Sequence, residues 1–393
     1  MKKFGFSKSA FCKALRTFSA SVGITAVCML ATVSLLGLEG PKEAWVSAQP
    51  AWQDQQGAQA AAAFGEAATP ATTQAQDLSS HSVVPMGQAF GIKLFTDGVI
   101  VASLSDIYTT QGVCCPAAQA GLRPGDYLVS ANGVEIENNA ALASYIGKSN
   151  GQSITFLVRR NGQDFETTVT PVFGEGSFKT GMWVRDSAAG VGTLTFYDPA
   201  TGCFAGLGHG ICDSDAGHVM ELKSGEPAGI TLCGIVRGAP ERPGQLQGYF
   251  SSDDPMGSLL ANNETGVYGQ LYEAPQGQPV EVLPRNQVHP GPVQILASID
   301  QAGPRLYEGE IVEISGADQP TRNLVVRVTD PVLLQATGGI VQGMSGSCIL
   351  QDGKVAGAVT HVFTDDPTMG YGIFAETMLE QCRKASENTG AAA

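Results

Sequence analysis

The sequence predicts a mainly β protein with two folded parts. Its 393 residues include 49 glycines and 21 prolines, and only 15% of the residues are charged. Between residues 180 and 375, short apolar runs alternate with glycine, proline or Asn-Gly, a pattern typical of short strands joined by tight turns. The formal net charge of −14 and the lack of a basic stripe beyond the N-terminus argue against a nucleic-acid-binding protein.

Residues 1–48 are expected to direct export. Five Lys and Arg side chains lie within the first 16 residues, and an uncharged apolar run follows at residues 18–38. This order is typical of a signal peptide or an uncleaved signal-anchor, and it places the remainder outside the cytoplasm. Val46-Ser47-Ala48 resembles a signal-peptidase site but lies far from the run, which favours the anchor. Residues 49–80 are expected to form a flexible linker, and residues 386–393 a disordered tail.

Residues 81–173 have the pattern of a separate α+β domain. Two strands, a short helix, a hairpin, a longer helix and a second hairpin are expected in that order, with Asn132-Gly133 as the first hairpin turn. The stretch A-G-L-R-P-G-D-Y-L-V-S-A-N-G resembles a PDZ domain of the bacterial protease type. A PDZ domain binds a peptide by strand addition. The groove is therefore expected at Ala89, Phe90, Gly91 and Ile92. The alternative is a domain that acts as a spacer or a self-association surface.

The segment from Gly339 to Leu350 carries the strongest chemical signal. It holds Ser345 within Gly-Met-Ser-Gly, and the N–H groups of Gly343 and Ser345 can form an oxyanion hole. An Asp-Gly hairpin and a second strand follow, which is the layout around the nucleophile of chymotrypsin-like peptidases. Residues 174–385 are therefore predicted to be a chymotrypsin-like double β-barrel with Ser345 as nucleophile. His361 lies on the strand expected to line the specificity pocket, where it is either a pocket wall or a structural histidine.

A nucleophilic serine needs a base and an orienting acid. Of the five histidines, His209 lies between glycines upstream of Ser345, as the order His, Asp, Ser requires. Asp330 follows an apolar strand between the two, so we expect it to orient His209. Four other aspartates remain open as alternatives: Asp213, Asp215, Asp300 and Asp318.

A zinc site is the competing interpretation of the same region. Four side chains that could bind zinc fall close together in sequence, namely Cys203, His209, Cys212 and His218. Their spacing matches no common zinc finger, and the two flanking glycines would hold His209 loosely. We therefore expect neither a metal nor another cofactor. The nine cysteines do not suggest a disulfide framework.

Three stretches resemble the SpoIVB peptidase family of endospore-forming Firmicutes. They are G-L-G-H-G-I-C-D, G-G-I-V-Q-G-M-S-G-S, and G-A-V-T-H-V-F followed by D-P-T-M-G-Y-G-I. The resemblance places that family's His, Asp and Ser on His209, Asp330 and Ser345. Cys348 stands where the family pattern leads us to expect proline.

The resemblance also implies a function. It implies export across the forespore membrane into the intermembrane space, with membrane attachment through the N-terminal segment until the enzyme cleaves itself near its N-terminus. The implied substrate is a membrane-bound regulatory protein, whose cleavage allows an intramembrane protease to process a late mother-cell sigma factor. Self-association through the PDZ domain is a further expectation. The alternative is a non-enzymatic, membrane-anchored PDZ scaffold.

Overall fold

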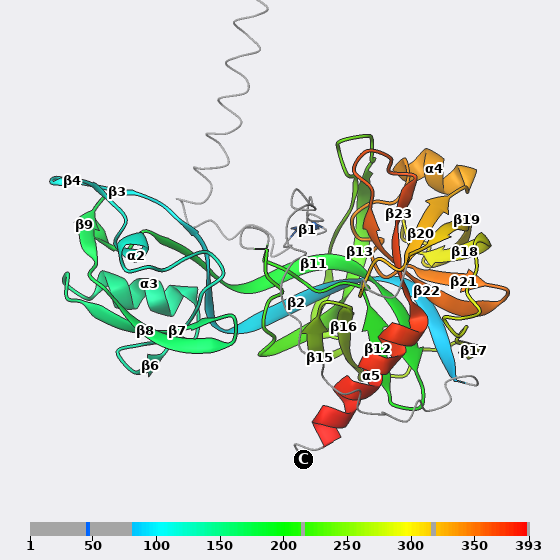
Figure 1. The fold of residues 1–393 in the computed structure, drawn as a ribbon, viewed down its shortest axis with the longest axis horizontal. Coiled ribbons are helices and arrows are strands. Elements are labelled where there is room, and N and C mark those ends of the chain that lie inside the picture. Colours follow the sequence, from blue (N-terminus) through cyan, green and yellow to red (C-terminus); the bar gives the residue numbers. More distant parts are fainter. Residues whose placement is uncertain (1–44, 48–80, 214–216, 316–319, 391–393) are drawn as a thin grey trace, which may run out of the picture. The chain divides into compact units, whose positions relative to one another are not determined.

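The computed structural model describes residues 45–47, 81–213, 217–315 and 320–390. Within these ranges no helix is long and apolar enough to cross a membrane. The apolar run at 18–38 and the predicted linker at 49–80 lie outside the described residues. The described residues form a mainly β fold, as predicted (Figure 1).

The first sheet is built around two long antiparallel strands, β2 (Ser82–Leu104) and β11 (Met182–Asp198). Its path runs β1-β14-β13-β2-β11-β12-β16-β15 and does not return on itself among the described strands, so this half is an open sheet. The expected first barrel is therefore not closed. Its other members are β1 (Trp45–Ser47), β12 (Cys203–Gly206), β13 (Ser224–Val236), β14 (Gln245–Pro255), β15 (Gly257–Asn263) and β16 (Gly266–Leu271), and β17 (Val280–Glu281) pairs with β2.

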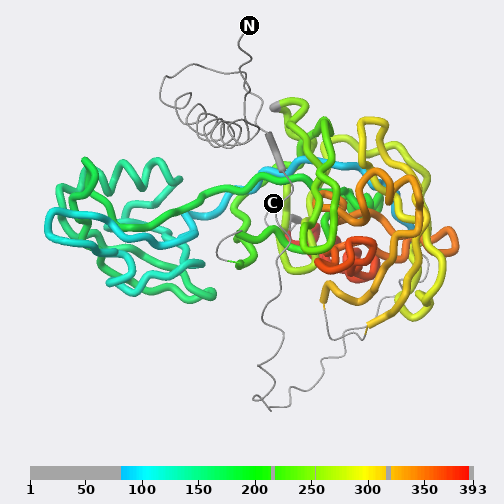
Figure 2. Tube along the Cα trace, turned by 90° about the horizontal axis from the view of Figure 1, so that it is seen from above, coloured from blue at the N-terminus to red at the C-terminus, as the bar shows by residue number. Residues whose placement is uncertain are grey.

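The second half is a closed barrel, as the sequence predicted. Its strand order is β18-β19-β20-β23-β22-β21, and Ile295, Val326 and Val359 are fully buried in its core. The helix α5, red in Figure 2, follows the barrel. Its residues Met378 and Leu379 share a buried core with residues of the first sheet. The elements are β18 (Gly291–Ala297), β19 (Arg305–Ile314), β20 (Leu324–Val328), α4 (Pro331–Thr337), β21 (Cys348–Gln351), β22 (Lys354–Val362), β23 (Met369–Phe374) and α5 (Ala375–Gly390).

The two long strands β2 and β11 extend into the α+β domain and form part of it. Val99 and Val101 of β2 lie in its core, and Met182 and Val184 of β11 pack against that core. The rest of the domain consists of β3 (Ile107–Thr109), β4 (Gly112–Cys114), α2 (Pro116–Gln119), β5 (Tyr127–Ala131), β6 (Val134–Glu135), α3 (Asn139–Gly147), β7 (Ile154–Arg160), β8 (Gln163–Val169), β9 (Val172–Gly174) and β10 (Ser177–Lys179).

Local turn chemistry is where sequence and structure agree best. Asn132 and Gly133 both adopt positive φ, 49° and 76°, as a two-residue hairpin turn requires. The Asn138 side chain accepts a hydrogen bond from the Ala141 N–H and so caps α3, as expected. Both features depend only on residues a few positions apart, so the sequence was enough to predict them.

The predicted PDZ groove at Ala89, Phe90, Gly91 and Ile92 is wrong. These residues lie in the part of β2 that belongs to the first sheet, where β11 pairs with all four and β13 pairs with Gly91 and Ile92 on the other edge. Gly91 pairs with β11 at Val191 and with β13 on the other side. No backbone edge is left for a peptide at Gly91 and Ile92, where an edge strand was expected to bind it. Phe90 and Ile92 are core residues of the first sheet.

We predict that Gly91→Val destabilises the whole first sheet. A Cβ at position 91 would overlap the Phe250 ring, and overpacking of this kind costs roughly 1–3 kcal/mol. Gly229→Val on β13 is the matched control, because a Cβ there meets nothing closer than 3.7 Å. Thermal unfolding followed by circular dichroism should show a lower melting temperature for the first variant only. An unchanged melting temperature with a selective loss of peptide binding would restore the groove assignment.

Candidate active site

Ser345 lies in a loop that joins α4 to β21 and that both halves of the fold hold in place. The Thr193 N–H on β11 donates to the Ser345 carbonyl at 2.9 Å, and the Thr193 hydroxyl donates to the Gly343 carbonyl at 2.8 Å. On the barrel side, the Gly346 N–H donates to the Val359 carbonyl at 2.8 Å. Gly346 has a φ of +94°, and a Cβ there would overlap the Thr193 carbonyl, so only glycine fits.

The hydroxyl of Ser345 is half-buried and donates to the Thr360 carbonyl at 2.6 Å. Within the described part of the chain, the N–H groups of Gly343 and Ser345 donate no hydrogen bond. The intervening Met344 N–H is already bonded to the Val341 carbonyl at 3.0 Å. Two free N–H groups beside a serine hydroxyl are what the predicted oxyanion hole requires.

A sharp turn after β12 places His209 next to the segment of β22 to which the Ser345 hydroxyl is bonded. Leu207 and Gly208 both have positive φ, 66° and 69°, and a Cβ on Gly208 would lie 2.8 Å from Thr360 Cγ2. The imidazole Nδ1 lies 2.9 Å from the Gly210 carbonyl oxygen, so in the neutral ring Nδ1 donates and Nε2 is free to accept a proton. Burial lowers the pKa of His209 below 6.5, which keeps the ring neutral and able to act as a base.

No hydrogen bond joins Ser345 to His209 in this state, because the serine hydroxyl is bonded to Thr360. The hydroxyl must turn away from that carbonyl before Nε2 can take its proton. Sequence analysis missed both Thr360 and Thr193, because backbone groups leave no residue-type signature. The only clue was that Thr360 stands next to His361 on the strand after the nucleophile loop.

Asp330 is not where the prediction placed it. One carboxylate oxygen accepts the Val332 and Leu333 N–H groups at 2.8 and 3.0 Å, which caps α4, and the other accepts the Glu308 N–H at 3.2 Å. No hydrogen bond or ion pair joins Asp330 to His209, whose Nδ1 is bonded to a carbonyl instead. An aspartate followed by proline is a common start of a helix, and this capping signal outweighs the chain-order argument.

The alternative aspartates do not replace Asp330. Asp213 is buried in an ion pair with Arg185 at 3.1 Å, and the exposed Asp300 accepts the Ala302 N–H at 2.8 Å. Asp215 and Asp318 lie outside the described residues. Among the described side chains, no carboxylate is hydrogen-bonded to His209, and the Gly210 carbonyl is its Nδ1 partner.

His361 packs against His209. The two ring centroids are 4.8 Å apart and tilted by 36°. The Nδ1 atom of His361 is buried and has no hydrogen-bond partner among the described residues. Burial, and then the proximity of His209 and Arg322, lower its pKa to about 2, so it stays neutral. Its expected role in the specificity pocket stays a prediction.

The competing zinc ligands are not gathered around His209. Cys203 is buried in the core beside α5, and His218 is exposed. In the described ranges, no group of three or more His, Cys, Asp or Glu side chains is arranged to hold a metal ion. All seven described cysteines are free thiols. Cys348 is fully buried in the same core as Cys203, which raises the pKa of its thiol to about 12.

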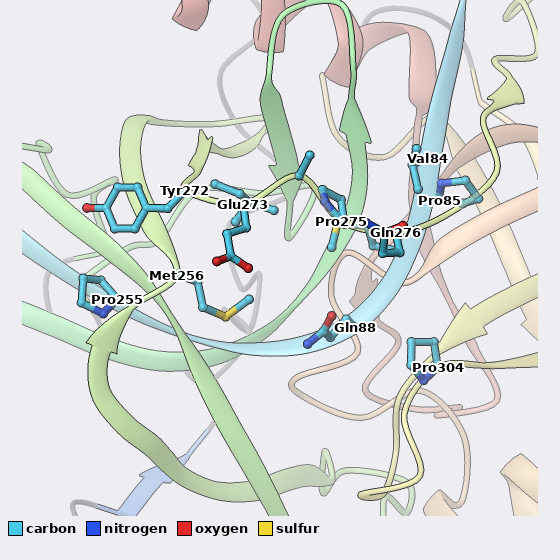
Figure 3. A pocket seen from close by; sticks show the side chains of 13 residues that line it. Val84, Pro85, Gln88, Pro255, Met256, Tyr272, Glu273, Pro275, Gln276 and Pro304 are labelled. Atoms are coloured by element: carbon cyan, nitrogen blue, oxygen red, sulfur yellow. The ribbon is translucent and has the colours of Figure 1, made fainter.

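A large hollow elsewhere on the first sheet contains none of these residues. Its volume is about 710 Å³, and its walls come from the start of β2, the end of β14 and the loop after β16 (Figure 3). Met256, Tyr272 and Glu273 line it, but no histidine or serine does. The hollow therefore offers no hydrolytic chemistry of its own.

Two family models match regions of this fold. The model of the SpoIVB peptidase S55 family matches residues 176–379, and that of the PDZ domain matches residues 111–160. The chain belongs to the SpoIVB peptidase family.

Short stretches are also similar to other proteases. A putative zinc metalloprotease of Bartonella henselae is 38% identical over 77 residues, 20% of this chain and 22% of that protein. The probable protease eep of Enterococcus faecalis is 35% identical over 86 residues, 21% and 20% of the two chains. The chain thus spans about a fifth of the length of these relatives.

We predict that Asp330 acts as a helix cap. Asp330→Ala should lower the free energy of unfolding by about 1 kcal/mol, whereas Asp330→Asn and Asp330→Ser cap nearly as well and should stay close to wild type. Urea unfolding and labelling of Ser345 by a fluorophosphonate measure stability and activity separately. Loss of labelling in folded Asp330→Asn would instead make Asp330 the third member of a triad.

We also predict that the burial of His361 makes the folded protein less stable at acid pH. Its folded-state pKa lies below 6.5, so under acid conditions the unfolded chain takes up a proton that the folded chain refuses. The free energy of unfolding should therefore decrease as the pH falls below 6.5, by at most about 1.4 kcal/mol per pH unit for this one group. His361→Asn should flatten this slope, while the same change at the exposed His289 should not. Equal slopes in both variants would contradict the assignment.

Proposed function

We propose that this protein is an exported serine endopeptidase of sporulation. Its substrate is a membrane-associated regulatory protein, and cleavage triggers intramembrane-protease processing of a late mother-cell sigma factor. It acts in the space between the forespore membranes, tethered by its N-terminal segment until it cleaves itself near the N-terminus. Family membership and the cationic, apolar N-terminus support this proposal.

The observation that carries the proposal is that Ser345 and His209 both contact β22: the serine hydroxyl is bonded to the Thr360 carbonyl, and the His209 ring packs against His361. The Gly343 and Ser345 N–H groups of the same loop donate no hydrogen bond within the described residues. For the reaction, the Ser345 hydroxyl leaves the Thr360 carbonyl and gives its proton to His209 Nε2 as its oxygen attacks the substrate carbonyl. The N–H groups of Gly343 and Ser345 bind the resulting oxyanion. His209 then protonates the leaving amine, and water hydrolyses the acyl-enzyme by the same proton relay.

The PDZ domain supports a role in protein recognition. Its groove is not formed by residues 89–92, since these belong to the first sheet. A PDZ domain can bind the membrane-bound substrate, and it can equally bind a second copy of this chain. A protein that acted only as a PDZ scaffold would have no need for Ser345 and His209 to be fixed in position by main-chain hydrogen bonds.

Fluorophosphonate labelling of the full chain in detergent tests the proposed chemistry. Wild type should be labelled and Ser345→Ala should not. The labelling rate of His209→Ala should be lower than that of wild type by a factor of about 10³ or more. Ser347→Ala is the matched control, because this neighbouring hydroxyl is buried and donates to the Met344 carbonyl. If the folded wild-type protein is not labelled at all, the non-enzymatic PDZ scaffold becomes the better explanation.

A further inference from the structure

The outer edge of β14 carries a strand from the N-terminal segment. β14 pairs with β13 on one side, and on the other side with β1, antiparallel. The register places Trp45 opposite Tyr249, Val46 opposite Gly248, and Ser47 opposite Gln247. β1 thus lies directly before residues 49–80, the stretch in which self-cleavage is proposed.

The nucleophile loop is bonded to the same edge. The Leu246 N–H donates to the Gln342 carbonyl at 2.8 Å, and the Gln342 N–H donates to the Gly244 carbonyl at 2.8 Å. β13 occupies the opposite edge at these positions, since Leu246 pairs with Ile235 there. β1 and the loop that holds Ser345 are therefore consecutive neighbours along one edge of β14.

The chain direction of β1 leads from Trp45 to Ser47 toward the loop that holds Ser345. In this antiparallel register, each residue further along β1 moves one residue back along β14, from Tyr249 toward Gln247. The next position on β14 is Leu246, whose N–H is already bonded to Gln342. A peptide that follows this edge must therefore leave it at the nucleophile loop, three residues before Ser345.

We propose that the outer edge of β14 at Gln247–Tyr249 is the peptide-docking strand of the peptidase, and that Trp45–Ser47 occupies it as an intramolecular substrate strand. The proposal rests on the proposed function and adds how the substrate is held. Recognition through strand addition uses main-chain groups and so accepts different sequences. The same edge can therefore hold the chain's own segment first and another protein's extended segment later.

The tether explains how such a contact is released. A short strand linked to its own docking edge experiences an effective concentration on the order of millimolar. Once the chain is cut after Ser47, the strand is no longer tethered to the folded part, and three residues alone bind weakly. Uncleaved enzyme is therefore blocked toward other substrates, and self-cleavage opens the edge.

The pairing has one residue that a substitution can target. Gly244 and Leu246 turn their main-chain groups to the outer edge, so alternation along the strand turns those of Gly248 outward as well. Val46 is the residue opposite Gly248. Val46→Pro removes an N–H from this pair, whereas Val46→Ala keeps it.

Hydrogen exchange in the full-length Ser345→Ala protein, which cannot cut itself, tests the docking edge without any need for activity. With Val46→Pro added, the Gly248 amide should exchange about tenfold faster or more than with Val46→Ala. Amides of β7 in the PDZ domain serve as an internal reference. Equal protection of Gly248 in the two proteins would overturn the proposal.

A second arm uses the active enzyme and a synthetic peptide of residues 42–66 as substrate. Val46→Pro should slow self-cleavage about fivefold or more and raise the initial rate of peptide cleavage, with fluorophosphonate labelling of Ser345 unchanged. Unchanged rates in both reactions, with normal labelling, would also overturn the docking edge. Absent labelling of wild type would overturn the proposed function instead, and the exchange of Gly248 would still decide the pairing.

Discussion

The hydrogen bond from the Thr193 N–H to the Ser345 carbonyl is the contact on which the active site depends. It joins the nucleophile loop to β11, the strand that pairs with β2 along most of its length. Val359 and Thr360 fix the same loop to the barrel through Gly346 and the Ser345 hydroxyl. Because both halves of the fold hold it, the loop can keep two N–H groups free of internal bonds.

The long strands also explain why the PDZ domain and the peptidase share one sheet. β2 leaves the first sheet, contributes Val99 and Val101 to the PDZ core, and the chain returns along β11. The same pair of strands therefore contributes to the PDZ core and carries Thr193, with register shifts between Trp183 and Val184 and between Arg185 and Ser187.

The histidine at the site is oriented in an unexpected way. The Gly210 carbonyl bonds its Nδ1, and the His361 ring packs against it, while Asp330 caps a helix. A carbonyl can fix the tautomer but brings no negative charge to stabilise the imidazolium that the proposed mechanism requires. Burial then makes the base weaker, since it lowers the pKa of His209. A lower pKa allows the neutral base to persist under mildly acid conditions.

What the sequence determined by itself was local. The Asn-Gly turns, the Asn138 cap and the tight glycine turn at Ser345 each depend on a few neighbouring residues, and all could be read from one segment. The tertiary structure decided what depends on pairing. Alternating apolar residues at 90–94 fit a PDZ edge or a sheet interior equally well, and only the neighbours β11 and β13 settle the choice. Likewise an aspartate before a helix and an aspartate beside a histidine look the same in sequence, because a carboxylate's role is set by the donors that the fold brings to it.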